Sequence, residues 1–317
     1  MYEKSYQHRD VVDGVYSSTE ADFIITTSLD GHLKFWKKNY IGIEAVKHYK
    51  AHQSKITGVS ISPSGFHMTT CSSKDDALKI FDILNFDMIH FMKLEFTPYL
   101  CEFLNKSNNP ELILVVTEKN SGNMHIIKGE SKGEILKTIK IHSFPILVMK
   151  FNVVYNTLIT IDQSGMIEYS EPQTSELPST VKFKYKAETD LYTLSQNKLT
   201  CLSLTVSPNG RFMAMMCKDK VIRIFNFLTG KIYKTYNESV KHYFENYNEI
   251  VSNDKLKIDK SDYDKRLVLE REIEKYIDVL PGLNAQFDDS NKFICYSSML
   301  GIKIVNFHND TVCLVLF

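Results

Sequence analysis

Histidine, serine and aspartate residues recur together in this sequence, and they are the residue types of a nucleophilic catalytic triad. The first set comprises His8, Ser28 and Asp30. The same types return one repeat later at His52, Ser73 and Asp75. An enzyme carries its triad once, whereas a structural network is rebuilt in every repeat. The recurrence therefore favours a structural role, in which a buried imidazole bridges a carboxylate and a hydroxyl so that each polar group has a partner.

The spacing of the histidines supports this interpretation. His8, His52 and His142 lie 22 or 23 residues before three turn positions, which are Asp30, Asp75 and Ser164. A small residue stands two positions before the turn acid at Ser28, Ser73 and Cys217, the last of which precedes Asp219. In the first repeat Trp36 adds an indole N–H donor. We therefore expect a buried network of four side chains there, namely His8, Ser28, Asp30 and Trp36.

A recurring phrase predicts the elements that position these side chains. It is SLDGHLKFW ending at Trp36, KDDALKIF ending at Phe81 and CKDKVIRIF ending at Phe225, with weaker copies ending at Lys128, Ser170 and Asn306. Successive end points are 45, 47, 42, 55 and 81 residues apart. The first three intervals match the period of WD40 repeats, about 40–45 residues. Insertions lengthen the last two.

Each phrase is a tight turn followed by alternating or fully apolar residues, which is the pattern of a β-strand. Two short apolar strands precede it, separated by turns such as Pro63-Ser64-Gly65 and Pro208-Asn209-Gly210, and a more polar strand follows. Four strands at this period form one blade of a β-propeller. We expect an all-β WD40 propeller with six four-stranded blades over residues 1–317. A seventh blade is expected outside the sequence, because the chain ends on an apolar strand at Phe317.

Some parts of the chain depart from the repeat. The second unit has Phe81 in place of tryptophan and the third and sixth lack the turn acid, so packing must hold these blades. Residues 171–180, EPQTSELPST, form a polar loop in the fourth unit. Residues 238–278 contain two helical patterns, at 238–250 with Val240, Tyr243, Phe244, Tyr247 and Ile250, and at 262–278 with Leu267, Val268, Ile273 and Ile277. We expect all helices in this helical hairpin, which either folds against a blade or serves as a partner-binding arm.

Composition excludes several classes of function. Lysine plus arginine equals aspartate plus glutamate, 38 against 38, so no global field attracts nucleic acid, and the run KFWKK is better explained as a solvated strand end. The six cysteines form no CxxC pair, which favours free thiols in a reducing compartment. The apolar runs are too short to span a membrane, and the N-terminus is not a signal peptide. No histidine pair has metal-ligand spacing, so neither metal nor cofactor is expected.

Several stretches of the sequence, two of them outside the repeated phrase, resemble a known family. The segments NFDMIHFMKL and RLVLEREIEK, together with MYEKSYQHRDVV and MLGIKIVN, resemble the WD-repeat cyclophilins, over nearly the whole chain. The resemblance implies a nuclear protein that associates with spliceosomal proteins, and that contacts nucleic acid only indirectly. It also implies a cyclophilin domain, a peptidyl-prolyl isomerase, located after the propeller. No segment matches the active-site motifs of that domain, so we assign no catalytic residue to this chain.

The favoured function is therefore a non-catalytic protein-docking scaffold. In a WD40 blade the turn acid and the network histidine lie at the top face, so their neighbours are expected in solvent. These candidate partner-binding residues are Leu29, Lys74 and Lys218, beside the turn acids, and Arg9 and Gln53, beside the histidines. An apolar residue among cations suits a partner that offers an apolar side chain near acidic groups. The helical hairpin is the competing site, and a targeting module for a downstream isomerase domain is the alternative function.

Overall fold

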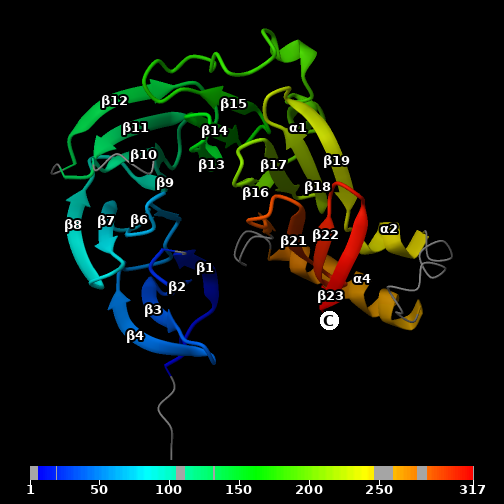
Figure 1. Cartoon of the computed structure of the whole chain (residues 1–317), viewed down its shortest axis with the longest axis horizontal. Helices are drawn as coiled ribbons and strands as arrows, with labels where there is room; N and C mark the ends of the chain where they lie inside the picture. Colours follow the sequence, from blue (N-terminus) through cyan, green and yellow to red (C-terminus); the bar gives the residue numbers. More distant parts are fainter. Residues whose placement is uncertain are drawn as a thin grey trace, which may run out of the picture. The chain divides into compact units, whose positions relative to one another are not determined.

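Tight turns and short apolar strands organise this chain, as the repeat predicts. We describe it from a computed structural model, which describes residues 6–18, 20–104, 111–130, 133–245, 260–276 and 284–316. The chain is an all-β propeller of six blades, each a separate antiparallel sheet whose strands follow one another in chain order (Figure 1). Glycines with positive φ angles, such as Gly65 at 75° and Gly210 at 72°, form the predicted Pro-x-Gly turns.

The first three blades have four strands each. Blade 1 comprises β1 (Val12–Ser18), β2 (Phe23–Ser28), β3 (His32–Lys38) and β4 (Ile43–Lys50). Blade 2 comprises β5 (Gly58–Ile61), β6 (His67–Ser72), β7 (Ala77–Asp82) and β8 (Asp87–Lys93). Blade 3 comprises β9 (Pro98–Phe103), β10 (Ile113–Glu118), β11 (Asn123–Lys128) and β12 (Ile135–Lys140).

The remaining blades are less uniform. Blade 4 comprises β13 (Ile146–Asn152), β14 (Thr157–Asp162) and β15 (Ile167–Ser170). Blade 5 comprises β16 (Cys201–Val206), β17 (Phe212–Cys217), β18 (Val221–Asn226) and β19 (Lys231–Asn237). Blade 6 comprises β20 (Ala285–Phe287), β21 (Phe293–Ser298), β22 (Gly301–Asn306) and β23 (Thr311–Leu316).

Blade 4 has three strands, so the prediction of four strands in every blade is wrong at this point. The segment after β15 contains Pro172 and Pro178, which have no N–H to donate to a sheet. It continues through a 3₁₀ turn, η1 (Lys186–Glu188), and a short helix, α1 (Thr193–Gln196), so helices are not confined to residues 238–278. Leu194 is fully buried, and the Lys182 N–H donates to the Leu228 carbonyl of blade 5 at 2.8 Å. The polar loop is thus followed by a segment that packs on blade 5.

Apolar side chains from neighbouring blades form the cores. Between blades 1 and 2 they include Leu33 and Phe35 of β3, and Met68 and Phe81 of blade 2. Similar clusters join blade 2 to blade 3, blade 3 to blade 4 and blade 5 to blade 6. Because side chains alternate along a strand, Lys34, between Leu33 and Phe35, faces the opposite side of the sheet. In the third strand of a blade, this alternation places polar side chains on the side of the sheet that faces away from the apolar core shared with the next blade.

The chain divides into two compact units, residues 1–162 with 168–177, and residues 163–167 with 178–317. Each unit is described separately below. The first contains blades 1 to 3 and most of blade 4, and the second contains blades 5 and 6 with the inserted helices.

The insertion between blades 5 and 6 contains α2 (Val240–Glu245) and α4 (Lys260–Lys275). Val240 and Tyr263 pack with Leu300 of blade 6, and all three are fully buried. Leu267 joins this cluster as predicted, but Val268 and Ile273 do not, because they are 56% and 41% exposed. Tyr247, Ile250 and Ile277 lie outside the described residues.

Candidate functional site

The histidine network of blade 2 is complete. His52 is buried, its Nδ1 lies 2.9 Å from Asp75 Oδ2, and its Nε2 lies 2.9 Å from Thr70 Oγ1 on β6. A neutral ring with its proton on Nδ1 donates to the carboxylate and accepts from the Thr70 hydroxyl, so both ring nitrogens are satisfied. Burial lowers the pKa of His52, although the Asp75 charge opposes this, and so favours the neutral ring.

In blades 1 and 4 the network histidine also pairs with a threonine of its own blade. His142 Nε2 lies 2.7 Å from Thr160 Oγ1, and its Nδ1 lies 3.2 Å from Asp162 Oδ2. In blade 1, His8 Nε2 lies 2.7 Å from Thr26 Oγ1. Each of these histidines precedes its threonine by 18 residues, as His52 precedes Thr70. This constant spacing is the sequence signal from which the hydroxyl partner could have been found.

Ser28 and Ser73 are therefore not the hydroxyl partners of the histidines. Ser73 donates to the Pro98 carbonyl at 2.8 Å, and Ser28 is buried beside Asp30. Thr26 fills the role in blade 1, because it also accepts from Trp36 Nε1 at 2.8 Å. A threonine hydroxyl can accept one hydrogen bond and donate another, which links the indole to the imidazole.

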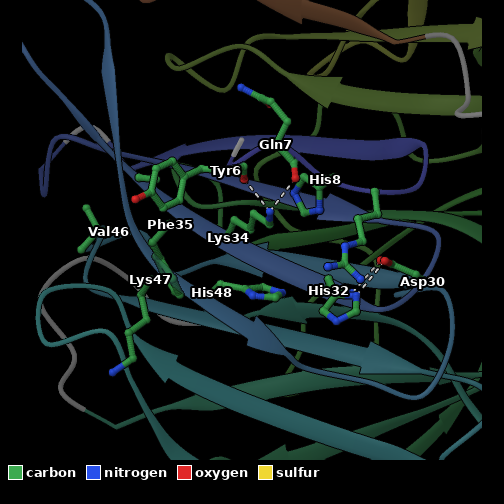
Figure 2. Close-up of a pocket in the computed structure, with 12 residues that line it drawn as sticks. Tyr6, Gln7, His8, Asp30, His32, Lys34, Phe35, Val46, Lys47 and His48 are labelled. Carbon is green, nitrogen blue, oxygen red and sulfur yellow. Dashed lines mark hydrogen bonds and ion pairs between the residues drawn. The ribbon is translucent and has the colours of Figure 1, made fainter. Parts of the chain in front are cut away.

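The acids also differ from the expected pattern. Asp30 pairs with His32 at 2.7 Å instead of His8, whose Nδ1 is buried without a partner in the described structure (Figure 2). The acid of blade 4 is Asp162 on β14, two positions before the predicted turn at Ser164. Asp219 of blade 5 binds Arg223 through two hydrogen bonds, of 2.6 and 3.2 Å. The complete network of histidine, threonine and acid therefore occurs in blades 2 and 4 among the described residues.

Gly31 shows how closely blade 1 approaches the blade 2 network. Its φ angle is +79°, and a Cβ at this position would lie 2.4 Å from the His52 carbonyl oxygen. The His52 N–H donates to the Gly31 carbonyl at 3.1 Å. Only glycine fits this contact, so the turn after Asp30 helps to position the next histidine.

A pair of substitutions in blade 2 tests the assignment of the hydroxyl partner. Thr70→Val keeps the side-chain shape but leaves the buried His52 Nε2 without its partner, so the free energy of unfolding should fall by about 1–3 kcal/mol. Ser73→Ala should cost less than about 1 kcal/mol, because Ser73 is only half-buried and bonds a carbonyl. Urea denaturation measures both values, and equal losses would contradict the assignment.

The histidines predict how stability depends on pH. Burial lowers the pKa of His8, His48, His52 and His125 below 6.5. A base with a lowered pKa binds fewer protons when folded than when unfolded, so stability should fall as the pH drops below about 6.5. Thermal melts at pH 7.5 and 5.5 measure the change. The variant His8→Gln/His48→Gln should show a smaller decrease, and an unchanged pH dependence in this variant would count against these two side chains.

Basic residues recur on the third strand of several blades, and each has an internal partner. Lys34 Nζ donates to the carbonyls of Tyr6 and Gln7, and Lys79 Nζ donates to the Ala51 carbonyl. Lys79 thereby fixes the residue before the network histidine of blade 2. These hydrogen bonds tie the third strands of blades 1 and 2 to the segments that precede β1 and β5.

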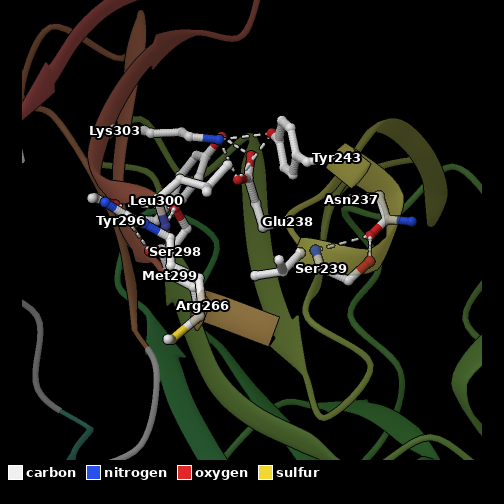
Figure 3. A network of polar contacts seen from close by, with 12 residues as sticks. Asn237, Glu238, Ser239, Tyr243, Arg266, Tyr296, Ser298, Met299, Leu300 and Lys303 are labelled. Carbon is white, nitrogen blue, oxygen red and sulfur yellow. Dashed lines mark hydrogen bonds and ion pairs between the residues drawn. The ribbon is translucent and has the colours of Figure 1, made fainter. Parts of the chain in front are cut away.

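Blade 6 has a different buried polar network (Figure 3). Lys303 of β22 and Glu238 are 1% and 4% exposed and form an ion pair. Tyr296 donates to Glu238 Oε1 at 2.7 Å, and Tyr243 of α2 donates to Glu238 Oε2 at 3.1 Å. Burial raises the pKa of both tyrosines, and the nearby Glu238 charge adds to this effect. Sequence reasoning missed this network, because its charged partners are 65 residues apart.

A second polar contact ties the inserted helices to blade 5. Glu270 of α4 is buried, accepts from the Val240 N–H at 3.3 Å and pairs with Lys220 at 3.2 Å. Three apolar residues of α4 are exposed, namely Val268, Leu269 and Ile273. The inserted helices thus fold against the propeller, as one of the two interpretations expects, and the partner-binding arm stays a prediction.

The predicted partner-binding residues lie in turns and loops of the two units. Lys74, Gln53 and Arg9 of the first unit are exposed, as is Lys218 of the second. Leu29 is half-buried instead of exposed, and its N–H donates to the Val11 carbonyl at 3.0 Å. Four of the five positions can therefore be reached by a partner.

The described residues place limits on other chemistry. They contain no group of three or more histidine, cysteine, aspartate or glutamate side chains that could hold a metal ion. None of their helices is long and apolar enough to cross a membrane. The polar clusters found are the blade networks described above, whose hydrogen bonds are largely internal.

Comparisons with known proteins agree with the fold. A family model for the WD domain, G-beta repeat, matches residues 43–82. The chain is 42% identical to peptidyl-prolyl cis-trans isomerase cyp15 of Rhizopus delemar, over 99% of this chain and 50% of that protein. It is 37% identical to peptidylprolyl isomerase domain and WD repeat-containing protein 1 of Homo sapiens, over 96% of this chain and 47% of that protein. It is 38% identical to peptidyl-prolyl cis-trans isomerase CYP71 of Arabidopsis thaliana, over 100% of this chain and 50% of that protein.

Blades of this kind define a WD40 β-propeller. The chain belongs to the family of WD-repeat cyclophilins. It spans about half the length of the curated relatives it matches.

Proposed function

We propose that this chain is a non-catalytic protein-docking scaffold that works in nuclear pre-mRNA splicing complexes. The observation that carries the scaffold proposal is the use of its histidines. In blades 2 and 4 the network histidine is only 2% and 3% exposed and its hydrogen bonds are made within its own blade, so a substrate in solution cannot reach either ring. The splicing context and the nuclear location rest on the family resemblance alone.

The alternative proposal is a targeting module for a peptidyl-prolyl isomerase. It is supported by the names of the relatives, each of which is about twice as long as the matched region. In such a protein the propeller would hold partners while a separate domain isomerises their proline bonds. The two proposals are compatible, because both assign binding to the propeller.

The isolated chain should not accelerate cis/trans isomerisation of a proline peptide. The uncatalysed reaction takes tens to hundreds of seconds at 25 °C, so catalysis is easily measured against it. Peptide isomerisation is followed with and without the purified chain. Acceleration that persists through repurification and is proportional to chain concentration would overturn the non-catalytic proposal.

Two groups of surface substitutions compare the candidate docking faces. The first combines Leu29→Ser, Lys74→Glu and Lys218→Glu. The second combines Val268→Ser, Leu269→Ser and Ile273→Ser, at the exposed apolar residues of α4. Substitution is preferable to deletion of residues 238–278, since deletion would remove Glu238 and leave the buried Lys303 unpaired.

Pull-down from nuclear extract with mass spectrometry identifies the proteins that each variant retains. If the first group releases splicing proteins and the second does not, the predicted top-face residues bind them. The reverse result assigns docking to α4. A wild-type chain that retains no splicing protein would contradict the proposed context.

A further inference from the structure

Blade 1 carries a cavity of about 450 Å³ (Figure 2). Its walls come from the segment before β1 and from the two outer strands, β3 and β4. Six basic side chains line it, namely His8, Arg9, His32, Lys34, Lys47 and His48. Asp30 is the only carboxylate among the lining residues. The cavity therefore has a basic lining in a chain whose overall charge is balanced.

The basic groups are close enough to repel one another. Burial lowers the pKa of His48, and the charges of His32, Lys34 and Arg9 lower it further. Burial also lowers the pKa of Lys34, where the Arg9 charge adds to the effect and Asp30 opposes it. The Asp30 charge opposes this repulsion at both His48 and Lys34, so the basic groups of the cavity outweigh its one carboxylate.

The single carboxylate is already engaged. Asp30 accepts from His32 at 2.7 Å from the ring and 3.1 Å from the backbone N–H. These hydrogen bonds outweigh the effect of burial and lower the pKa of Asp30. In contrast, Arg9 and His48 form no hydrogen bond or ion pair with the part of the chain that the structure describes. They can accordingly donate to a ligand without breaking an existing contact.

The charge balance indicates the class of ligand. Lys47 Nζ lies over the Tyr49 ring, 5.4 Å from its centroid, so the cations that face the cavity are Arg9 and Lys34. They carry two positive charges against one negative charge on Asp30, and protonation of one imidazole raises the excess to two. A phosphate monoester near neutral pH carries about this charge with opposite sign, and a guanidinium group binds it through paired hydrogen bonds. A ligand with a single carboxylate group would neutralise only half of this excess positive charge.

The apolar wall favours a peptide over a free ion. Val46 is 39% exposed and Tyr6 is 55% exposed, and both line the cavity beside the basic groups. Neighbouring side chains of a phosphorylated segment would contact them, whereas inorganic phosphate would not. We propose that this cavity binds a phosphorylated serine or threonine side chain of a protein partner. This proposal names the partner chemistry of the docking scaffold and rests on that proposed function.

Histidine NMR and calorimetry test the proposal on the full chain. The probes are the blocked peptide glycyl-phosphoseryl-glycine, its unphosphorylated form, and inorganic phosphate, at matched ionic strength. We expect the phosphopeptide to shift the His8 and His48 ring signals saturably, and to bind more tightly than inorganic phosphate. The unphosphorylated peptide should give no shift. Affinity should also increase from pH 8 to about 6.5, because the ligand charge favours protonation of the imidazoles.

Two variants make the result specific to the cavity. Arg9→Glu should weaken phosphopeptide binding about tenfold or more, through repulsion of the dianion. Lys119→Glu removes an exposed lysine of the turn between β10 and β11 in blade 3 that does not line the cavity, and should leave the affinity unchanged. Thermal melts confirm that both variants are folded.

Three outcomes would overturn the proposal. One is the absence of a saturable shift with the phosphopeptide. A second is full binding by folded Arg9→Glu. A third is equal or tighter binding of inorganic phosphate, which would identify a site for free anions. If phosphopeptide binding fails while the chain still retains splicing proteins, the scaffold proposal survives and only the ligand assignment falls.

Discussion

Lys303→Met is expected to lower the free energy of unfolding by about 3–5 kcal/mol, the usual cost of removing one partner from a buried ion pair. Lys303 and Glu238 are almost inaccessible to solvent, so the remaining carboxylate would keep only its two tyrosine donors. Its charge would then lie uncompensated between β22 and α2. Urea denaturation of the wild type and the variant measures the difference.

Lys234→Met provides a matched control within the same unit. Lys234 pairs with Asp310, but these side chains are 30% and 50% exposed. An exposed pair contributes about 0–1 kcal/mol because solvent screens it, so this variant should be nearly as stable as the wild type. Similar losses in the two lysine variants would mean that burial does not set the cost, contrary to our interpretation.

Trp36→Ala should cost about 3–5 kcal/mol, the range for removing a large aromatic side chain from a core. Trp36 is 4% exposed and donates to Thr26, which also binds His8. The substitution creates a cavity in blade 1 and removes one hydrogen bond from the threonine. Thermal and urea unfolding of the two proteins measure the loss.

Trp36→Phe is the control for this prediction, and blade 2 supplies the precedent. Phe81 occupies the equivalent position there and is 1% exposed. Phenylalanine restores most of the lost volume without the N–H group, so the loss should stay below about 1.5 kcal/mol. If alanine and phenylalanine destabilise the protein equally, the hydrogen bond to Thr26 dominates instead of packing.

The blades were predictable from the sequence because their signals are local. A turn followed by alternating residues occurs in each repeat, and the first three intervals match one period. Blade 4 differs because Pro172 and Pro178 remove N–H donors where a fourth strand was expected. The polar loop at residues 171–180 was recognised from the sequence, but a fourth strand was still predicted in this blade.

The polar networks were less predictable, since choosing partners requires the direction of each side chain. Serine and threonine both occur near the turn of blade 2, and Thr70, not Ser73, faces His52. The buried face of α4 was misassigned for a related reason. Apolar spacing favoured Val268 and Ile273, whereas the packed face uses Tyr263 and the buried carboxylate of Glu270. A pattern based on hydrophobic residues cannot identify a buried charged group.

The ion pair of Glu238 also bears on how blade 6 joins blade 5 during folding. The connection from β4 to β5 has seven residues, 51–57, whereas that from β19 to β20 has 47 residues, 238–284. The entropy cost of closing a connection grows with its length, so the connection between β19 and β20 costs more to close than that between β4 and β5. Glu238 lies at the start of that connection and binds Lys303 beyond its end. The contact therefore closes this connection close to its base.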